Sequence, residues 1–127
     1  MASASTRNLG LAARLGSRHR DEAAVEARTA VAFAAEGIGT FLLVLFICGL
    51  LSVGSAGGLQ LDLAGLGMLH ALVLGVLVYA LAASSGAHFH PAVSIGMLAI
   101  RAIRGRDAAW YIVCQLVGGV LAGLVVL

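Results

Sequence analysis

The sequence has few charged side chains. Asp, Glu, Lys and Arg together make up 11% of its 127 residues, whereas 61% of the residues are hydrophobic. A soluble domain is about one-quarter charged, and a disordered chain combines low hydrophobicity with high charge. The mean hydropathy is +1.02, so the composition excludes both classes and predicts a membrane protein.

The sequence also lacks the residue groups on which most enzyme sites depend. It has no glycine-rich phosphate loop and no set of metal ligands, since His88 and His90 alone are too few to hold zinc. Cys48 and Cys114 each lie inside an apolar run, which favours small buried residues over a disulfide or metal pair. We therefore expect no enzyme activity, no metal and no cofactor.

Residues 1–30 form a polar stretch that holds five of the eight basic residues, all of them arginine, and three acids. No apolar run within it is long enough for the core of a signal peptide. We interpret residues 1–30 as a cytoplasmic N-terminal tail. An organelle transit peptide is the alternative, and the acids near the end of the stretch disfavour it.

Three later segments, 31–53, 63–83 and 108–127, are apolar and long enough to cross a bilayer. At about 1.5 Å per residue, roughly 20 helical residues span a hydrocarbon core of about 30 Å. Trp110 and Tyr111, at the start of the third segment, are expected in an interfacial aromatic belt. Small residues four apart indicate close helix packing: Ala35 and Gly39, Ala71 and Gly75, and Gly119 and Gly123.

The segment between the second and third spans is irregular. Residues 84–90 are small or polar, and Pro91 then opens an apolar stretch, 91–100, that is half the length of a span. Proline suits the first position of a helix, and His90 falls at its N-cap. The predicted fold is therefore an all-α membrane protein with three transmembrane helices plus one re-entrant half-helix.

The placement of arginine predicts the orientation. All eight arginines lie in the tail or in residues 101–106, and the loop between the first two spans has none. Positive charge marks the cytoplasmic side, so the half-helix enters from that side and its N-terminus points into the membrane. Irregular backbone at that depth is tolerated only where protein buries it or water lines it. This arrangement is typical of channels and transporters.

Three stretches carry a resemblance to a known family. The sequence SGAHFHPAVS at 85–94 resembles the first pore-loop signature of the aquaporin (major intrinsic protein) family, whose motif is Asn-Pro-Ala. AEGIGTF at 35–41 resembles the family's first helix, and YIVCQLVGG at 111–119 resembles its third. The resemblance covers about residues 31–127 and implies the first half of a six-helix channel, completed by an inverted second repeat.

The resemblance implies which residues face the solute. His90 takes the place of the pore asparagine, beside Pro91 and Ala92; a neutral histidine keeps one N–H donor, but it is bulkier and can gain a charge. His70 takes a selectivity-filter position, where strict water channels have Phe and glycerol facilitators have Trp. Histidine there resembles the plant vacuolar class and implies a polar filter for water and small neutral solutes such as ammonia, urea, hydrogen peroxide or glycerol. A packing role is the alternative for His70.

Three more polar residues are expected to brace the pore loop. Glu36 would cost about 3 kcal/mol in lipid unless it faces the bundle interior, and the family resemblance assigns it to the loop. His88 is expected to hydrogen-bond backbone rather than solute, and Gln115 to be an interior polar anchor.

The sequence stops at Leu127, and no second repeat precedes that point. We expect a fragment that does not conduct by itself, from a passive channel whose partners are the bilayer, the missing repeat in cis or trans, and copies of itself in a homotetramer. Nucleic acid is not an expected partner. An inverted homodimer conflicts with the arginine bias, and a secondary transporter needs paired repeats and a further carboxylate.

The alternative function is a non-conducting membrane scaffold or assembly partner. Such a protein keeps the channel fold, while the larger side chain of His90 closes the path. Substituting His90 by asparagine separates the two hypotheses.

Overall fold

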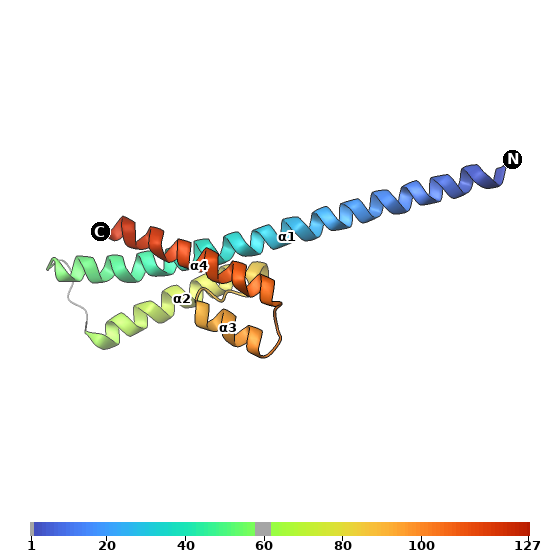
Figure 1. Ribbon diagram of the computed structural model, residues 1–127. Coiled ribbons are helices and arrows are strands. Elements are labelled where there is room, and N and C mark those ends of the chain that lie inside the picture. Colours follow the sequence, from blue (N-terminus) through green and yellow to red (C-terminus); the bar gives the residue numbers. More distant parts are fainter. Residues whose placement is uncertain (1, 58–61) are drawn as a thin grey trace. The chain divides into compact units, whose positions relative to one another are not determined.

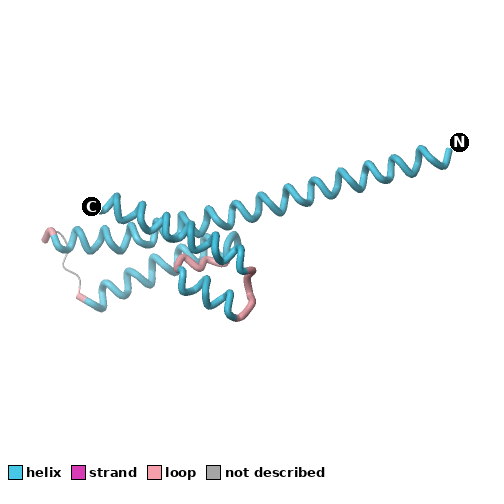
Figure 2. The backbone as a smooth tube through the Cα atoms, in the orientation of Figure 1, coloured by secondary structure: helices cyan, strands magenta, loops and turns pink. Residues whose placement is uncertain are grey.

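The computed structural model describes the backbone of residues 2–57 and 62–127 and the side chains of residues 23–57 and 62–127. This part of the chain consists of helices and their connections, without a strand. There are four helices in it (Figures 1 and 2): α1 (Ala2–Ser55), α2 (Leu63–Ser85), α3 (Pro91–Ala99) and α4 (Gly105–Val126). The chain divides into two compact units, Met1–Ala30 and Val31–Leu127. The second unit contains the apolar part of α1 together with α2, α3 and α4.

Three of the helices have the length and hydropathy of membrane spans, namely α1 from Ala23 to Ser55, α2 and α4. The prediction of an all-α fold with three spans and one short helix is therefore confirmed. The predicted bounds were slightly short, because α2 continues to Ser85 and α4 begins at Gly105. The predicted tail, residues 1–30, has the same bounds as the first compact unit, and residues 2–30 are helical.

Specific residues fix where the helices begin and end. The side chain of Asp62 caps α2 by accepting a hydrogen bond from the N–H of Gly65 over 2.7 Å. At the other end of α2, Gly86 has a φ of 88°, a left-handed conformation that glycine adopts without steric cost. Pro91 opens α3 with His90 as its N-cap, as the sequence predicts.

Helices α1 and α4 pack against each other in parallel. Gly37 faces Cys114, and Gly118 faces Gly37 and Phe41. A Cβ atom on Gly118 would overlap the carbonyl oxygen of Gly37 and lie 3.1 Å from the backbone nitrogen of Phe41. Glycine at position 118 is therefore what allows the two backbones to approach so closely.

Of the small residues that lie four apart in the three spans, only some are found where two segments approach closely. Ala35 is buried, and Gly39 lies under the ring of Phe89, where a Cβ atom would overlap the ring. Within the described part of the chain, a Cβ atom on Gly75 or Gly123 would have nothing within 4 Å. The expectation of close packing at these two positions is wrong for this unit, and Gly118 takes that role on α4.

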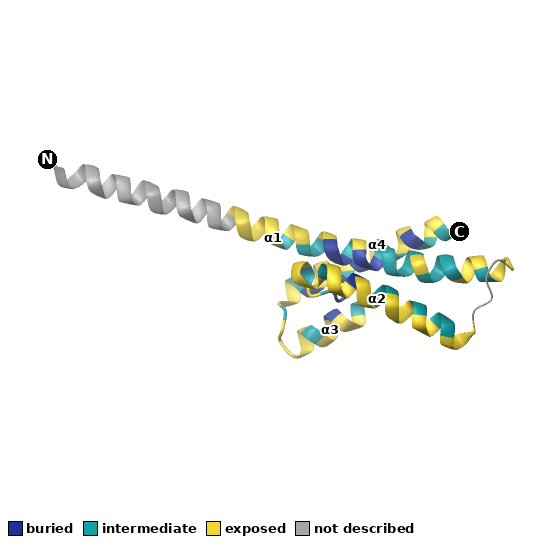
Figure 3. Cartoon of the chain, turned by 180° about the vertical axis from the view of Figure 1, so that it is seen from behind, coloured by how far each residue is buried: buried dark blue, intermediate teal, exposed yellow. Residues whose placement is uncertain are grey.

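The buried residues gather at one place in the fold. Figure 3 shows them where α1 and α4 meet the connection between α2 and α3. The most buried large side chains are Phe89, Gln115 and Glu36, so two of the three are polar. Half of the large apolar side chains on α2 are exposed instead, and Leu77 is the only one of them that is buried. The core of this unit therefore surrounds the segment Gly86 to His90, named here the 86–90 loop.

Gly118→Ala should destabilise the fold by about 1–3 kcal/mol, because the new methyl group has to push α1 and α4 apart. Gly123→Ala is the matched control on the same helix. Its methyl group meets open space, and alanine favours a helix over glycine by about 1 kcal/mol. The measurement is unfolding in detergent followed by circular dichroism, and equal stability of the two variants would contradict the close contact.

Candidate functional site

The 86–90 loop has an unusual backbone. Besides Gly86, the non-glycine residues Ala87 and Phe89 have positive φ angles of 53° and 51°. A left-handed conformation costs an L-residue about 1–2 kcal/mol, so the surrounding structure has to hold the loop in this shape.

The carboxylate of Glu36 on α1 holds the loop. Its Oε1 accepts hydrogen bonds from the hydroxyl of Ser85 (2.6 Å) and the backbone N–H of His88 (2.9 Å). Its Oε2 accepts from the backbone N–H of Phe89 (2.7 Å) and the side-chain amide of Gln115 (2.8 Å). Glu36 is completely buried, and these four donors replace the hydration that its carboxylate loses. One side chain thus ties α1 to α4 and to two adjacent amides of the loop.

A second set of hydrogen bonds extends this network to α3. The Nε2 of Gln115 also donates to the hydroxyl of Ser94 over 3.0 Å, and that hydroxyl lies 3.0 Å from Nδ1 of His88. Because a hydroxyl can donate one hydrogen bond and accept two, this pair is hydrogen-bonded in either tautomer of the His88 ring. The side chain of His88 therefore binds a buried hydroxyl rather than the backbone group expected from the sequence.

Two more hydroxyl groups bind carbonyl groups of this region. Thr40 on α1 donates to the carbonyl of Phe89 over 3.0 Å, and Tyr111 on α4 donates to the carbonyl of Ser85 over 2.7 Å. The ring of Tyr111 also lies edge-on to the ring of His88, with centroids 5.2 Å apart. Tyr111 is buried, so its ring faces the other helices of this unit, and the interfacial aromatic belt stays a prediction. The neighbouring Trp110 is about half exposed.

His90 lies at the end of the loop with its side chain exposed. Its Nδ1 accepts a hydrogen bond from the N–H of Ala92 over 3.1 Å, which caps α3. Since Nδ1 is the acceptor, the proton of the neutral ring is on Nε2. His90 can therefore cap the helix and still offer one N–H donor to another molecule.

A cavity of about 510 Å³, named here the His90 cavity, lies between α1, α2 and α4. His90 and Pro91 line it together with His70 from α2, so the structure brings these three residues to one space, whereas Ala92 is not in its lining. Most of the wall is apolar. The remaining lining residues are Thr40, Leu43, Val44, Ile47, Cys48, Phe89, Gln115, Leu116, Gly119 and Val120.

The cavity also establishes the course of α3. His90 lies level with residues 115–120 in the middle of α4, because both line the same space. The other end of α3, at Ala99, is joined by a short turn to Gly105, where α4 begins. Helix α3 has nine residues and is therefore about 13 Å long. It runs from the level of the middle of α4 back to the level of its start, which is the course of a re-entrant half-helix.

Four residues of this site were not predicted from the sequence: Thr40, Ser85, Ser94 and Tyr111. Ser94 could have been found, because a hydroxyl four residues after His90 in an otherwise apolar helix requires a buried partner. Tyr111 could not, since its distance from the loop depends on how α4 packs.

Comparisons with known proteins agree with one another. Residues 23–127 match the family model described as Major intrinsic protein. Over 113 residues the chain is 35% identical to "Probable aquaporin AqpM" of Archaeoglobus fulgidus. The aligned region covers 75% of this chain and 46% of that protein. It is 38% identical over 94 residues to "Glycerol uptake facilitator protein-like 6" of Lactiplantibacillus plantarum, covering 74% of this chain and 41% of the relative.

A third relative, "Aquaporin Z" of Photorhabdus laumondii, is 38% identical over 93 residues, which make up 72% of this chain and 40% of that protein. The chain thus spans less than half the length of these three curated relatives.

Glu36→Gln should destabilise the fold by about 2–6 kcal/mol. In the variant an NH₂ group replaces one of the two carboxylate oxygens, so the two donors that bound this oxygen lose their acceptor. Each buried donor without a partner costs about 1–3 kcal/mol. Glu26→Gln is the matched control, since Glu26 is exposed on the same helix; its effect should stay within about 0.5 kcal/mol. Denaturant unfolding in detergent measures both, and a small loss for Glu36→Gln would contradict the bracing role.

Proposed function

The chain belongs to the major intrinsic protein family, and on this premise we propose that it forms one half of a passive channel for water and small neutral solutes. It is an integral, multi-pass membrane protein, as its three apolar helices and its family indicate. The observation that supports the proposal most strongly is the His90 cavity, into which the start of a half-helix and two histidines converge.

The chemistry of the cavity favours neutral solutes. An apolar wall offers no replacement for the hydration shell of an ion, so entry of a charge is costly. The start of α3 adds about half a positive charge from the helix dipole, which repels cations. The Nε2–H of His90 donates a hydrogen bond to a passing oxygen, and His70 provides a second polar contact. Water, ammonia, urea, hydrogen peroxide and glycerol are the solutes that this lining suits.

The bracing residues act indirectly. Glu36 accepts hydrogen bonds from the loop and from Gln115, and the side chains of His88 and Gln115 both bind the hydroxyl of Ser94 on α3. They are positioning residues, because they keep the donor of His90 aimed at the solute. No enzymatic step and no cofactor is part of this function.

A continuous pore requires more wall than these helices supply. Although His70 and His90 line the cavity, their side chains are exposed, so the cavity is open on that side. We propose that an inverted second half closes it, in the same polypeptide or in a separate one, and that complete channels associate as homotetramers in the bilayer. The N-terminus is on the cytoplasmic side in this arrangement, in agreement with the arginine bias.

Stopped-flow shrinkage of proteoliposomes tests the proposal. The chain alone should give no more water flux than protein-free vesicles, and the chain joined to the second half of a curated relative should conduct. His90→Asn should change that flux by less than about tenfold, because either side chain can cap α3 with an acceptor atom and still present an N–H donor to the solute. Flux that appears only in His90→Asn would support the scaffold alternative, in which His90 closes the path.

His70→Phe should lower urea and glycerol permeability more than water permeability in the same joined chain, since it removes a polar group from the cavity wall. Leu72→Phe is the control, because Leu72 is exposed on the same helix and does not line the cavity. Equal effects of the two substitutions on urea would show that His70 is a packing residue.

A further inference from the structure

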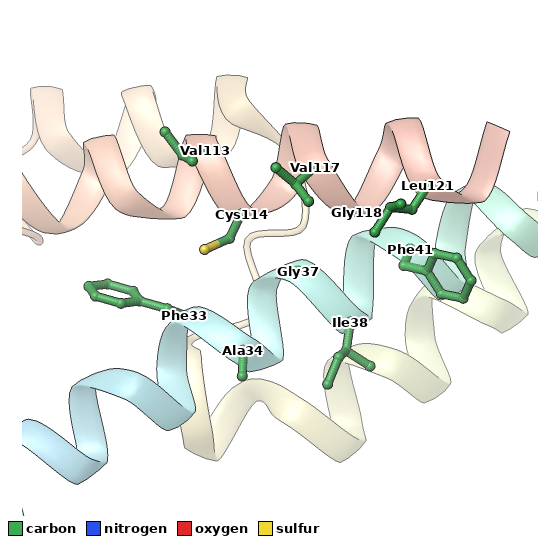
Figure 4. A pocket seen from close by; sticks show the side chains of 10 residues that line it. All are labelled: Phe33, Ala34, Gly37, Ile38, Phe41, Val113, Cys114, Val117, Gly118 and Leu121. Carbon is green, nitrogen blue, oxygen red and sulfur yellow. The ribbon is translucent and has the colours of Figure 1, made fainter. Parts of the chain in front are cut away.

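A second hollow lies between α1 and α4 (Figure 4). The α4 residues that line it and those that line the His90 cavity are on opposite faces of that helix, so the two hollows lie on opposite sides of the α1–α4 contact. It has a volume of about 450 Å³ and extends from Phe33 to Phe41 along α1 and from Val113 to Leu121 along α4. Eight residues of helix correspond to a length of about 12 Å. Its lining side chains are apolar apart from the thiol of Cys114. We name this hollow the outer groove.

The outer groove continues into a polar end on α4. Arg106, Trp110, Val113 and Val117 follow one another at spacings of four, three and four residues, so they lie on one face of the helix. All four side chains are exposed. The ring of Trp110 lies 6.1 Å from the ring of Phe33, which places Trp110 at the Phe33 end of the groove and Arg106 one turn beyond it.

The apolar groove, Trp110 and Arg106 follow one another in the same order as the acyl chain, the interfacial region and the phosphate of a phospholipid. An apolar groove suits an acyl chain, and tryptophan is favoured at the level where chains meet headgroups. The guanidinium of arginine binds phosphate oxygens through paired hydrogen bonds. A neighbouring helix also fits an apolar groove, but the guanidinium at the end of this one suits the phosphate of a lipid headgroup.

We propose that the outer groove, Trp110 and Arg106 form a binding site for an anionic phospholipid. The acyl chain lies along Val113, Val117 and Ile38, and the phosphate of the headgroup binds Arg106. Arg101 and Arg104, in the preceding turn, add to the positive field that favours a negatively charged headgroup. The site lies on the opposite side of the α1–α4 contact from the His90 cavity, so it is independent of conduction.

Trp110 provides the test, because it is the only tryptophan in the sequence. The full chain is reconstituted in phosphatidylcholine bilayers that contain increasing fractions of brominated phosphatidylglycerol or brominated phosphatidylcholine, and quenching of Trp110 fluorescence is followed. We expect the anionic lipid to be preferred at Trp110 by about fivefold, and Arg106→Gln to abolish this preference. Arg101→Gln removes the same charge outside the groove and should leave most of the preference intact.

A second pair of variants tests the groove itself. Ala34 is exposed and lines the groove, so Ala34→Phe should fill it and reduce quenching by both lipids. Ala80→Phe, at an exposed position on α2, should not.

Two outcomes would overturn the proposal. Equal effects of Arg106→Gln and Arg101→Gln would mean that only general surface charge attracts the lipid. Absence of quenching by either lipid would mean that protein covers the groove; in a Cys48→Ser variant, disulfide cross-linking through Cys114 would then identify a second copy of the chain as the occupant.

Discussion

The structure of this unit depends on the burial of one carboxylate. Glu36 would be costly inside a membrane protein, and it is stable there because four donors from α2, the 86–90 loop and α4 converge on its two oxygens. The dependence is mutual. Without Glu36, the N–H groups of His88 and Phe89 would be buried without partners, in a loop that two left-handed non-glycine residues already strain. The loop and the carboxylate therefore stabilise each other.

The fold was predictable because hydropathy and length determine which segments can span a bilayer. The three spans, the half-helix and the N-cap at His90 were inferred from local pattern, and the family from a resemblance of three motifs. The structure and the comparisons confirm them. The helix ends were predicted less well, because Ser84 and Ser85 look like loop residues. In the structure they continue α2, and the hydroxyl of Ser85 is satisfied by Glu36.

The residues of the site could be predicted only where the chemistry of a single side chain, in its local sequence, already requires a particular role. A carboxylate in an apolar run requires internal partners, so Glu36 could be singled out, but its partners come from segments about fifty and eighty residues away. The choice of Gly118 rather than Gly123 as the contact glycine depends on the rotation of α4 against α1, which a spacing of small residues does not define. For the same reason the sequence does not show that Tyr111 faces the interior of the unit while its neighbour Trp110 is exposed.

The contact between α1 and α4 separates two surfaces of different chemistry. On one side, Gln115 and Thr40 extend the hydrogen-bond network to the wall of a cavity that also holds His70 and His90. On the other side, the lining is apolar and leads to Trp110. Because glycines bring the two backbones together, little side-chain volume lies between these surfaces. Close packing of small residues thus allows the same two helices to place Thr40 and Gln115 on one side of a thin contact and an almost entirely apolar lining on the other.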